Sequence, residues 1–429
     1  MSSGDRRDRS NVLSALGHRN YRLYFFGQLI SLTGTWMQSV AQAWLAYELT
    51  HSAALLGIVG FAGQIPALVF SPAGGVVADR FARRRILLAT QTTSMLLAFA
   101  LAALTLSGKV TIAWILTLAA ISGIVNAFDI PTRQAFAVDM VGRADLMNAI
   151  ALNSSIFNGA RVVGPAVAGL LVARIGEGWC FLANGVSYLA VLGSLLAMRL
   201  PAHTRAADTS SAWTSVRAGF VYVAGAQPVR ALLLLLGLVS LTGMPYAVLM
   251  PVFAKEILGG GAHEMGLLMG CSGAGALAGA VVLASRKSVK GLGTFVALSA
   301  GSLGVALIAF SFSHVFWLSA ILLVPVGFFM MSEMASSNTL IQSMIPDEMR
   351  GRVMSVYAMM FMGMAPLGAL LAGSLAARIG APATVASGGA ICLVGSLVFA
   401  RRLPHLRVHA HRMIVELQMA AGDPPEEPT

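Results

Sequence analysis

The chain has 429 residues, of which 57% are hydrophobic and only 11% are charged, and its formal net charge is +11. A soluble protein of this length could not cover its surface with so few charges, so the composition excludes a soluble domain. Apolar runs of roughly 18 to 25 residues recur along the sequence, and a helix needs about 20 residues to cross a bilayer. The sequence therefore predicts an all-α polytopic membrane protein.

Twelve membrane-spanning helices are predicted in chain order. Their approximate ranges are 21–47, 54–78, 85–106, 111–131, 149–173, 178–199, 230–254, 264–285, 291–312, 315–340, 353–376 and 381–400. The longest polar interval inside the chain separates the sixth span from the seventh. We expect five regions: an N-terminal segment (1–20), an N-terminal six-helix bundle (21–199), a central loop (200–229), a C-terminal six-helix bundle (230–402) and a C-terminal tail (403–429).

Arginine and lysine are distributed unequally between the two sides that these spans define. The side with both termini carries 24 of the 29, the opposite loops carry Lys109, Arg174, Lys255 and Arg378, and Arg161 lies inside a span. Cytoplasmic loops of membrane proteins carry an excess of these residues. We therefore expect an inner-membrane protein with both termini in the cytoplasm. The positive charge then reports topology and leaves little support for nucleic-acid binding.

Short matching segments indicate an internal repeat. The letters ARIG occur at 173–176 and again at 377–380, and MRLP at 198–201 matches RRLP at 401–404. Gly164 and Pro165 match Ala365 and Pro366, so the offsets lie between 201 and 204 positions. Two six-helix halves in parallel duplication are typical of transporters that bind substrate between the halves and rock around it.

The segment GGVVADRFARRR at 74–85 resembles the loop motif G-x-x-x-D-R-x-G-R-R of the major facilitator superfamily. Alanine replaces the second glycine, and the motif positions are Gly75, Asp79, Arg80, Ala82, Arg83 and Arg84. Segments within 129–171 (DIPTRQAF, MNAIALNSS, NGARVVGPAVAGLL) and IPDEMRGRVMSVY at 345–357 resemble the branch of enterobactin exporters and macrolide efflux proteins. The resemblance covers essentially the whole chain.

This resemblance implies the major facilitator fold and a secondary transporter that acts as a monomer. Its partners would be the lipid bilayer, protons and an amphiphilic small molecule, such as a macrolide or a siderophore-like metabolite, exported by proton antiport. The sequence has no phosphate loop, no metal-ligand spacing and no nucleophile-base set, so neither an enzymatic activity nor a cofactor or metal is expected. An uptake symporter of the same fold and a non-transporting receptor or scaffold remain alternatives.

Two acids of the first half are candidates for a gate. The resemblance implies that Asp79 faces the N-terminus of the eleventh span, where a helix dipole attracts a carboxylate. It also pairs Asp129, which we place at the end of the fourth span, with Arg83. Alternatively, Asp129 is a proton-coupling carboxylate, a role for which burial would have to favour the protonated form of its carboxyl group.

Glu333 is the counterpart of Asp129 at an offset of 204 positions. The same offset places Arg83 on Lys287, beside Arg286, so Glu333 is a candidate for a second gate pair with Arg286 or Lys287. The alternative makes Glu333 a proton carrier in the central cavity. The second half has no counterpart of Asp79, because that position is Leu283.

Arg161 is the single basic residue well inside a span. An arginine at mid-membrane costs at least about 2.5–3.5 kcal/mol on insertion scales, so it should face protein or water. Three roles are open: counter-charge for Asp129 or Glu333, anchor for an anionic substrate, or support for the fifth helix. A guanidinium group suits the geometry of carboxylate or phosphate.

The fifth span also carries a motif of small residues around a Gly-Pro pair, which resembles that of proton-driven exporters and favours close packing with a bend. Its positions are Gly164, Pro165 and Gly169. Polar residues in other spans are candidates for the lining of a substrate cavity. They are Gln38, Gln42, Asn126, Asn158, Tyr246 and Tyr357.

Overall fold

The computed structural model describes residues 14–142, 145–199, 212–286 and 288–421, and all regular secondary structure in these ranges is helical. The N-terminal half contains η1 (Ser14–Gly17), α1 (Arg19–Thr50), α2 (Ala53–Arg80), α3 (Arg83–Leu106), α4 (Ile112–Val141), α5 (Leu146–Ile175) and α6 (Glu177–Ala197). The C-terminal half contains α7 (Ala212–Gly225), α8 (Gln227–Thr242), η2 (Met244–Ala247), α9 (Met250–Val252), η3 (Phe253–Ile257), α10 (Ala262–Ala284), α11 (Leu292–Ser311), α12 (Phe316–Ser343), α13 (Asp347–Ile379) and α14 (Ala381–Ala421).

Within the described ranges, twelve helical segments can span a membrane. Eleven are long and apolar enough by composition, and one of these, Gln227–Ile257, combines α8, η2, α9 and η3. The twelfth is α1, whose 32 residues suffice in length but include polar side chains such as Gln28, Gln38 and Glu48. The prediction of an all-α fold with twelve spans is confirmed.

The two ends of the bundle are named here by the chain termini. The terminal side holds the start of α1 and the connections after α2, α4, α6, α10 and α12. The far side holds the connections after α1, α3, α5, η3, α11 and α13. The basic segment after α2 lies on the terminal side, and Lys109 and Lys255 lie on the far side.

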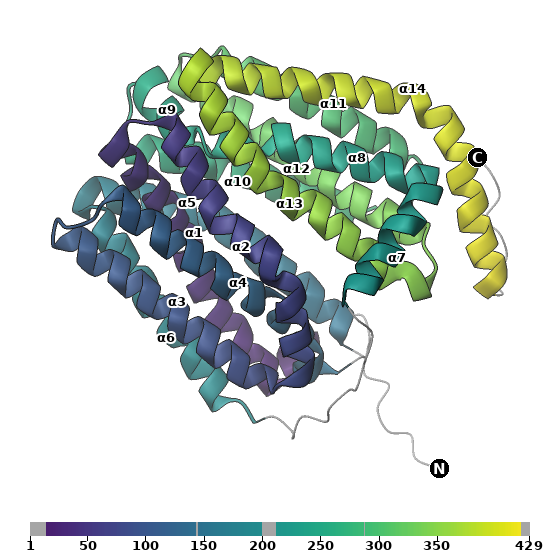
Figure 1. Ribbon diagram of the computed structural model, residues 1–429, viewed down its shortest axis with the longest axis horizontal. Coiled ribbons are helices and arrows are strands. Elements are labelled where there is room, and N and C mark those ends of the chain that lie inside the picture. The colour runs from purple at the N-terminus through teal and green to yellow at the C-terminus, as the bar shows by residue number, and fades with distance from the viewer. Residues whose placement is uncertain (1–13, 143–144, 200–211, 287, 422–429) are drawn as a thin grey trace.

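The two halves pack mainly along two helix pairs, α2 with α13 and α5 with α10. Figure 1 shows the halves close together around α9, on the far side, and diverging towards the terminal side. Glycines permit this approach: a Cβ on Gly266 would lie 2.5 Å from the carbonyl oxygen of Pro165 and 2.7 Å from the Cα of Gly169. A Cβ on Gly57 would lie 2.5 Å from the carbonyl oxygen of Ala369. Small residues at such crossings let helix backbones pack closely in a membrane.

The buried apolar side chains follow the same division. One cluster runs through both halves and includes Val59 from α2 and Phe253 from η3. A second cluster near the terminal side belongs to the N-terminal half alone, and in it the rings of Tyr24 and Phe136 meet at 6.2 Å between centroids. Apolar packing therefore joins the halves on the far side and leaves the N-terminal half with a core of its own on the terminal side.

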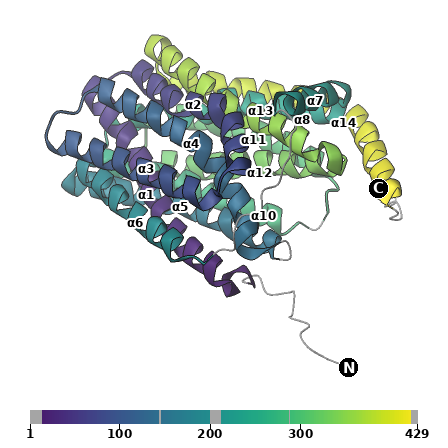
Figure 2. The ribbon, with the colours of Figure 1, turned by 60° about the horizontal axis from the view of Figure 1, so that its bottom comes forward.

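Helices extend into two of the regions that were expected to lie outside the bundles. The expected central loop, 200–229, contains α7, which packs on α13 because Gly219 brings its backbone against the carbonyl of Arg352. The expected tail, 403–429, begins as a continuation of α14, held by the buried side chains of Leu403 and Leu406. Figure 2 shows α7 beside α8 and the last part of α14 leaving the bundle.

Candidate functional site

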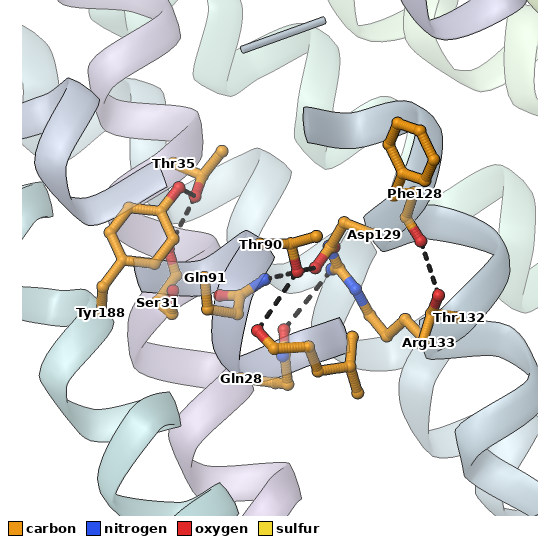
Figure 3. A network of polar contacts seen from close by, with 11 residues as sticks. Gln28, Ser31, Thr35, Thr90, Gln91, Phe128, Asp129, Thr132, Arg133 and Tyr188 are labelled. Carbon is orange, nitrogen blue, oxygen red and sulfur yellow. Dashed lines mark hydrogen bonds and ion pairs between the residues drawn. The ribbon is translucent and has the colours of Figure 1, made fainter. Parts of the chain in front are cut away.

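A buried acid lies at the centre of a polar network in the N-terminal half (Figure 3). Asp129 is on α4, and only 2% of the residue is exposed. Its Oδ1 accepts hydrogen bonds from Thr90 Oγ1 at 2.8 Å and from Gln91 Nε2 at 2.7 Å, both on α3. Arg133, one helical turn further along α4, donates to Oδ2 and forms an ion pair with it. Both carboxylate oxygens of Asp129 are therefore partnered, as a buried charge requires.

Neighbouring helices extend this network on both sides. Arg133 Nη1 lies 3.5 Å from Gln28 Oε1 on α1. Beside it, the hydroxyls of Thr35 on α1 and Tyr188 on α6 lie 3.4 Å apart. Four helices of one half thus carry polar groups of this region, which favours movement of the half as a unit.

The predicted pair between Asp129 and Arg83 is wrong for this structure. Arg83 Nη1 donates to Asp139 Oδ1 at 2.8 Å, and its Nη2 lies 3.9 Å from Asp79. The reason is the length of α4, which continues through Pro131 to Val141 instead of ending at the proline. Asp129 therefore lies inside the helix, where Arg133 reaches it, while Arg83 at the start of α3 meets the end of α4.

Glu333 on α12 occupies the position in the C-terminal half that Asp129 has in the first, but its surroundings differ. The residue is 1% exposed. Its Oε1 accepts a hydrogen bond from Ser337 Oγ at 3.1 Å, and its Oε2 has no hydrogen-bond partner among the described residues. Ser337 stands 204 positions after Arg133, so a serine replaces the cation at the same helical spacing. An isolated buried carboxylate is costly, and taking up a proton removes that cost.

The predicted gate pair between Glu333 and Arg286 does not form here. The guanidinium of Arg286 lies over the ring of Phe295, 4.6 Å from its centroid. Glu333 is buried inside α12, whereas Arg286 follows the end of α10 on the terminal side. Lys287, the other proposed partner, lies outside the described residues.

Asp79 lies near the end of α2, and its side chain is 62% exposed. Its nearest cation is Arg83, and the neighbouring Arg80 is exposed as well. Because the halves diverge on this side, the contact of Asp79 with the start of α13 stays a prediction for a conformation that is closed on the terminal side.

Arg161 lies on α5 beside the crossing with α10. Its guanidinium lies 5.9 Å from the ring centroid of Trp36, and its backbone carbonyl is close to Gly273. Arg161 forms no ion pair with a described acid, so neither Asp129 nor Glu333 is its partner here. The residue as a whole is half-buried.

The helix-five motif and the polar candidates fall into different surroundings. Gly164 faces α1, where a Cβ would lie 2.5 Å from Trp36 Cβ, whereas Pro165 and Gly169 face α10. Four of the six candidates for the cavity lining form hydrogen bonds within their own half. Gln38 accepts from Asn184 (2.7 Å), Asn158 donates to the Ser154 carbonyl (2.9 Å), the hydroxyls of Tyr246 and Ser272 bond to each other (2.6 Å), and Tyr357 donates to the Met334 carbonyl (3.0 Å). Gln42 and Asn126 are half-buried.

Polar contacts between the halves occur on the far side, where α1 meets η3. Lys255 Nζ lies 2.7 Å from Glu48 Oε1, and the hydroxyl of Tyr47 donates to the neighbouring Glu256. Lys255 Nζ also lies 3.4 Å from Nε2 of His51, which ends α1 in a left-handed conformation with φ of 47°. We call the four residues Tyr47, Glu48, Lys255 and Glu256 the far-side lock. A partly exposed ion pair of this kind contributes only about 0.2–1 kcal/mol, so the lock can hold the halves together and still open.

Reversing the charge of either ion-pair partner of the lock should open the far side. Glu48→Lys or Lys255→Glu places like charges next to each other, and we expect about a two- to fivefold shift towards the open conformation. The combined exchange Glu48→Lys with Lys255→Glu should restore the original distribution. The test uses a variant whose native cysteines are replaced and which carries spin labels at Lys109→Cys and His314→Cys. Pulsed electron spin resonance then measures the distance between the two labels across the far side.

Arg378→Glu is the matched control, because Arg378 is exposed on the far side and forms no ion pair with a described acid. If the double exchange behaves like the sum of the two single reversals, the pair does not couple the halves.

Neither Arg133 nor the far-side lock was among the candidates from sequence. The i to i+4 spacing of Asp129 and Arg133 would have indicated their pairing if α4 had been expected to continue past Pro131. Lys255 is a basic residue on the side with few positive charges, so an acid in the opposite half is the partner that its position suggests. Distance in sequence conceals that pairing, since Glu48 and Lys255 are 207 positions apart.

A family model described as transmembrane secretion effector matches residues 10–421. Among similar proteins, the staphyloferrin A transporter of Staphylococcus aureus is 28% identical over 82% of this chain and 88% of its own length. The multidrug efflux pump Tap of Mycolicibacterium fortuitum is 28% identical over 90% and 96%, respectively. The enterobactin exporter EntS of Shigella boydii is 25% identical over 89% and 91%.

Solved structures show the same fold. The nucleoside transporter NupG matches with a TM-score of 0.69 at 14% identity, over 90% of this chain and 98% of the other. A bacterial homologue of the iron transporter ferroportin in an inward-facing state matches with a TM-score of 0.66 at 18% identity, over 89% and 98%. At these identities the likeness concerns the fold alone, and it confirms the predicted major facilitator architecture.

Proposed function

Since the chain belongs to the transmembrane secretion effector family, a family of transporters and not of enzymes, we propose that it exports amphiphilic small molecules by proton antiport. The relatives named above include a siderophore transporter, a siderophore exporter and a drug efflux pump, and they support this substrate class and direction. A siderophore-like metabolite and a macrolide-type drug are the two substrate types that we infer.

Glu333 carries the proposal, because it is buried, has no cation partner in the described ranges and has one oxygen without a hydrogen bond. A carboxyl in this setting is stable when protonated and must meet water or a cation when it is ionised. Alternating access supplies this change, since it hydrates the same residue from opposite sides in turn. Asp129 has its cation on the next turn of the same helix, and we assign it a structural role.

The terminal side is proposed to face the cytoplasm, on the basis of the unequal distribution of arginine and lysine. With that orientation, the contacts on the far side close the outer end of the transporter and the diverging helices face inward. Arg161, half-buried beside the α5–α10 crossing without a described acid partner, is the proposed contact for an anionic group of the substrate.

Everted membrane vesicles test this function directly. With an acidic lumen, an antiporter accumulates a labelled macrolide or an iron-free siderophore and releases luminal protons at the same time, which a pH-sensitive dye reports. We expect both signals to require the protein and to disappear when an ionophore collapses the proton gradient.

The alternatives give different results in the same assay. An uptake symporter moves substrate and protons in the same direction, so it loads these vesicles only when the outside is acidic. A receptor or scaffold shows no proton movement that depends on substrate. Either result would contradict the proposal.

A further inference from the structure

An open apolar groove lies between the start of α1 and the end of α6, on the terminal side of the N-terminal half. Its volume is about 390 Å³, and its lining includes Leu23, Phe26, Gly27, Ile30 and Gly193, with Arg22 at one end. Phe26 is 54% exposed and Ile30 is 53% exposed. A Cβ on Gly193 would meet nothing within 4 Å, so this part of the groove is open space.

Arginines surround the end of this groove. Arg19 Nη1 donates to the carbonyl oxygen of Ala197 at 3.2 Å, and Arg84 Nη2 donates to that of Leu196 at 2.9 Å. Ala197 also lines the groove, so Arg19, Arg22 and Arg84 all lie near the last turn of α6. The Nε of Arg84 is buried without a hydrogen-bond partner, and none of the three forms an ion pair with an acid in the part of the chain that the structure describes.

From these observations we propose that the groove binds one anionic phospholipid, with its phosphate at Arg22 and an acyl chain along α1. The nine residues from Arg22 to Ile30 extend about 12 Å along α1, which reaches from the headgroup region into the hydrocarbon layer. The arginines lie where the span meets the membrane surface, which is the depth of a lipid phosphate. The apolar groove lies deeper, at the level of the acyl chains. The groove has the size of an ordinary ligand pocket, about 300–1,000 Å³.

The position of the groove favours a lipid over a transported substrate. It lies between two helices of the same half, whereas the contacts that must change during transport lie between the halves, at α2–α13 and α5–α10. A ligand here contacts α1 and α6 together and would stabilise the N-terminal half in either conformation.

Native mass spectrometry of the purified full-length protein tests the proposal with phosphatidylglycerol and phosphatidylcholine of identical acyl chains. We expect one phosphatidylglycerol to be retained in preference to phosphatidylcholine. Arg22→Gln should weaken phosphatidylglycerol binding about fivefold and phosphatidylcholine binding much less, because the lost arginine charge attracts a net anion more strongly than a phosphate that its own choline neutralises. Gly193→Leu should fill the groove and reduce retention of both lipids.

Two matched controls should leave lipid retention unchanged. Arg378→Gln removes an exposed arginine on the far side, and Val186→Phe adds bulk to the exposed face of α6 outside the groove. Equal retention of both lipids by the unmodified protein, or no effect of Arg22→Gln, would overturn the proposal. Displacement of phosphatidylglycerol by a transported macrolide or siderophore would also overturn it, because the groove would then be a substrate site.

Discussion

Replacing Glu333 with glutamine is expected to abolish proton movement that depends on substrate while leaving the fold and substrate binding intact. Glutamine keeps the size and the hydrogen-bond acceptor for Ser337, so the buried side chain of α12 remains packed. It cannot release a proton, and the carboxyl is the group that we assign to coupling. In proteoliposomes, net transport driven by a proton gradient should fall at least about tenfold, which corresponds to about 1.4 kcal/mol or more.

Exchange of labelled for unlabelled substrate across the membrane gives the decisive comparison. Such exchange needs alternating access but no net proton movement, so Glu333→Gln should retain it. Glu348→Gln is the control, because Glu348 is exposed at the start of α13 and should behave like the unmodified protein in both assays. If Glu333→Gln still transports against a gradient with proton release, the coupling carboxyl lies elsewhere.

Replacing Arg133 with methionine should be the most destabilising single change in the N-terminal half. The substitution leaves the carboxylate of Asp129 buried without its cation, and breaking a buried ion pair in this way costs about 3–5 kcal/mol. The double variant Asp129→Asn with Arg133→Met removes both charges and should recover most of the loss, since the asparagine side chain can still bond to Thr90 and Gln91. Thermal unfolding in detergent can be monitored as the fraction of protein that stays monodisperse. The unfolding temperatures then rank the variants by stability.

A matched substitution at an exposed arginine separates this effect from the loss of any arginine. Arg174→Met, at the far-side end of α5, should change the unfolding temperature little, because surface substitutions usually have small effects. If Arg133→Met is as stable as Arg174→Met, or if the double variant is no better than the single one, Asp129 does not depend on this pair.

The spans could be predicted from the sequence because each is a long apolar segment bounded by polar loops. The first span was predicted in the same way, at 21–47, although α1 includes polar side chains such as Gln28, Gln38 and Glu48. The boundaries were less predictable. Pro131 indicated an end of the fourth span, yet α4 continues for ten residues beyond it, because proline is tolerated in membrane helices when neighbouring groups satisfy the freed carbonyl.

The acids of the candidate site were identified from sequence, but their partners were not. The internal repeat indicated Asp129 and Glu333 as equivalent positions. It could not show that Arg133 and Ser337 make the two positions chemically different, because that difference depends on which face of each helix is buried. The far-side lock depends on how two distant segments meet across the halves, and neither composition nor periodicity contains that information.

The span from Gln227 to Ile257 changes helix type repeatedly, from α8 through η2 and α9 to the π-helical turn η3. Helices bend at prolines and π-turns, and this span contains Pro245, Pro251 and η3. Lys255 and Glu256 are consecutive residues of η3, so both contacts of the far-side lock belong to one short helical segment. A bend at Pro251 or at η3 would move both contacts together while α8 remains packed on α13. We therefore expect both contacts of the far-side lock to break in the same step when the far side opens.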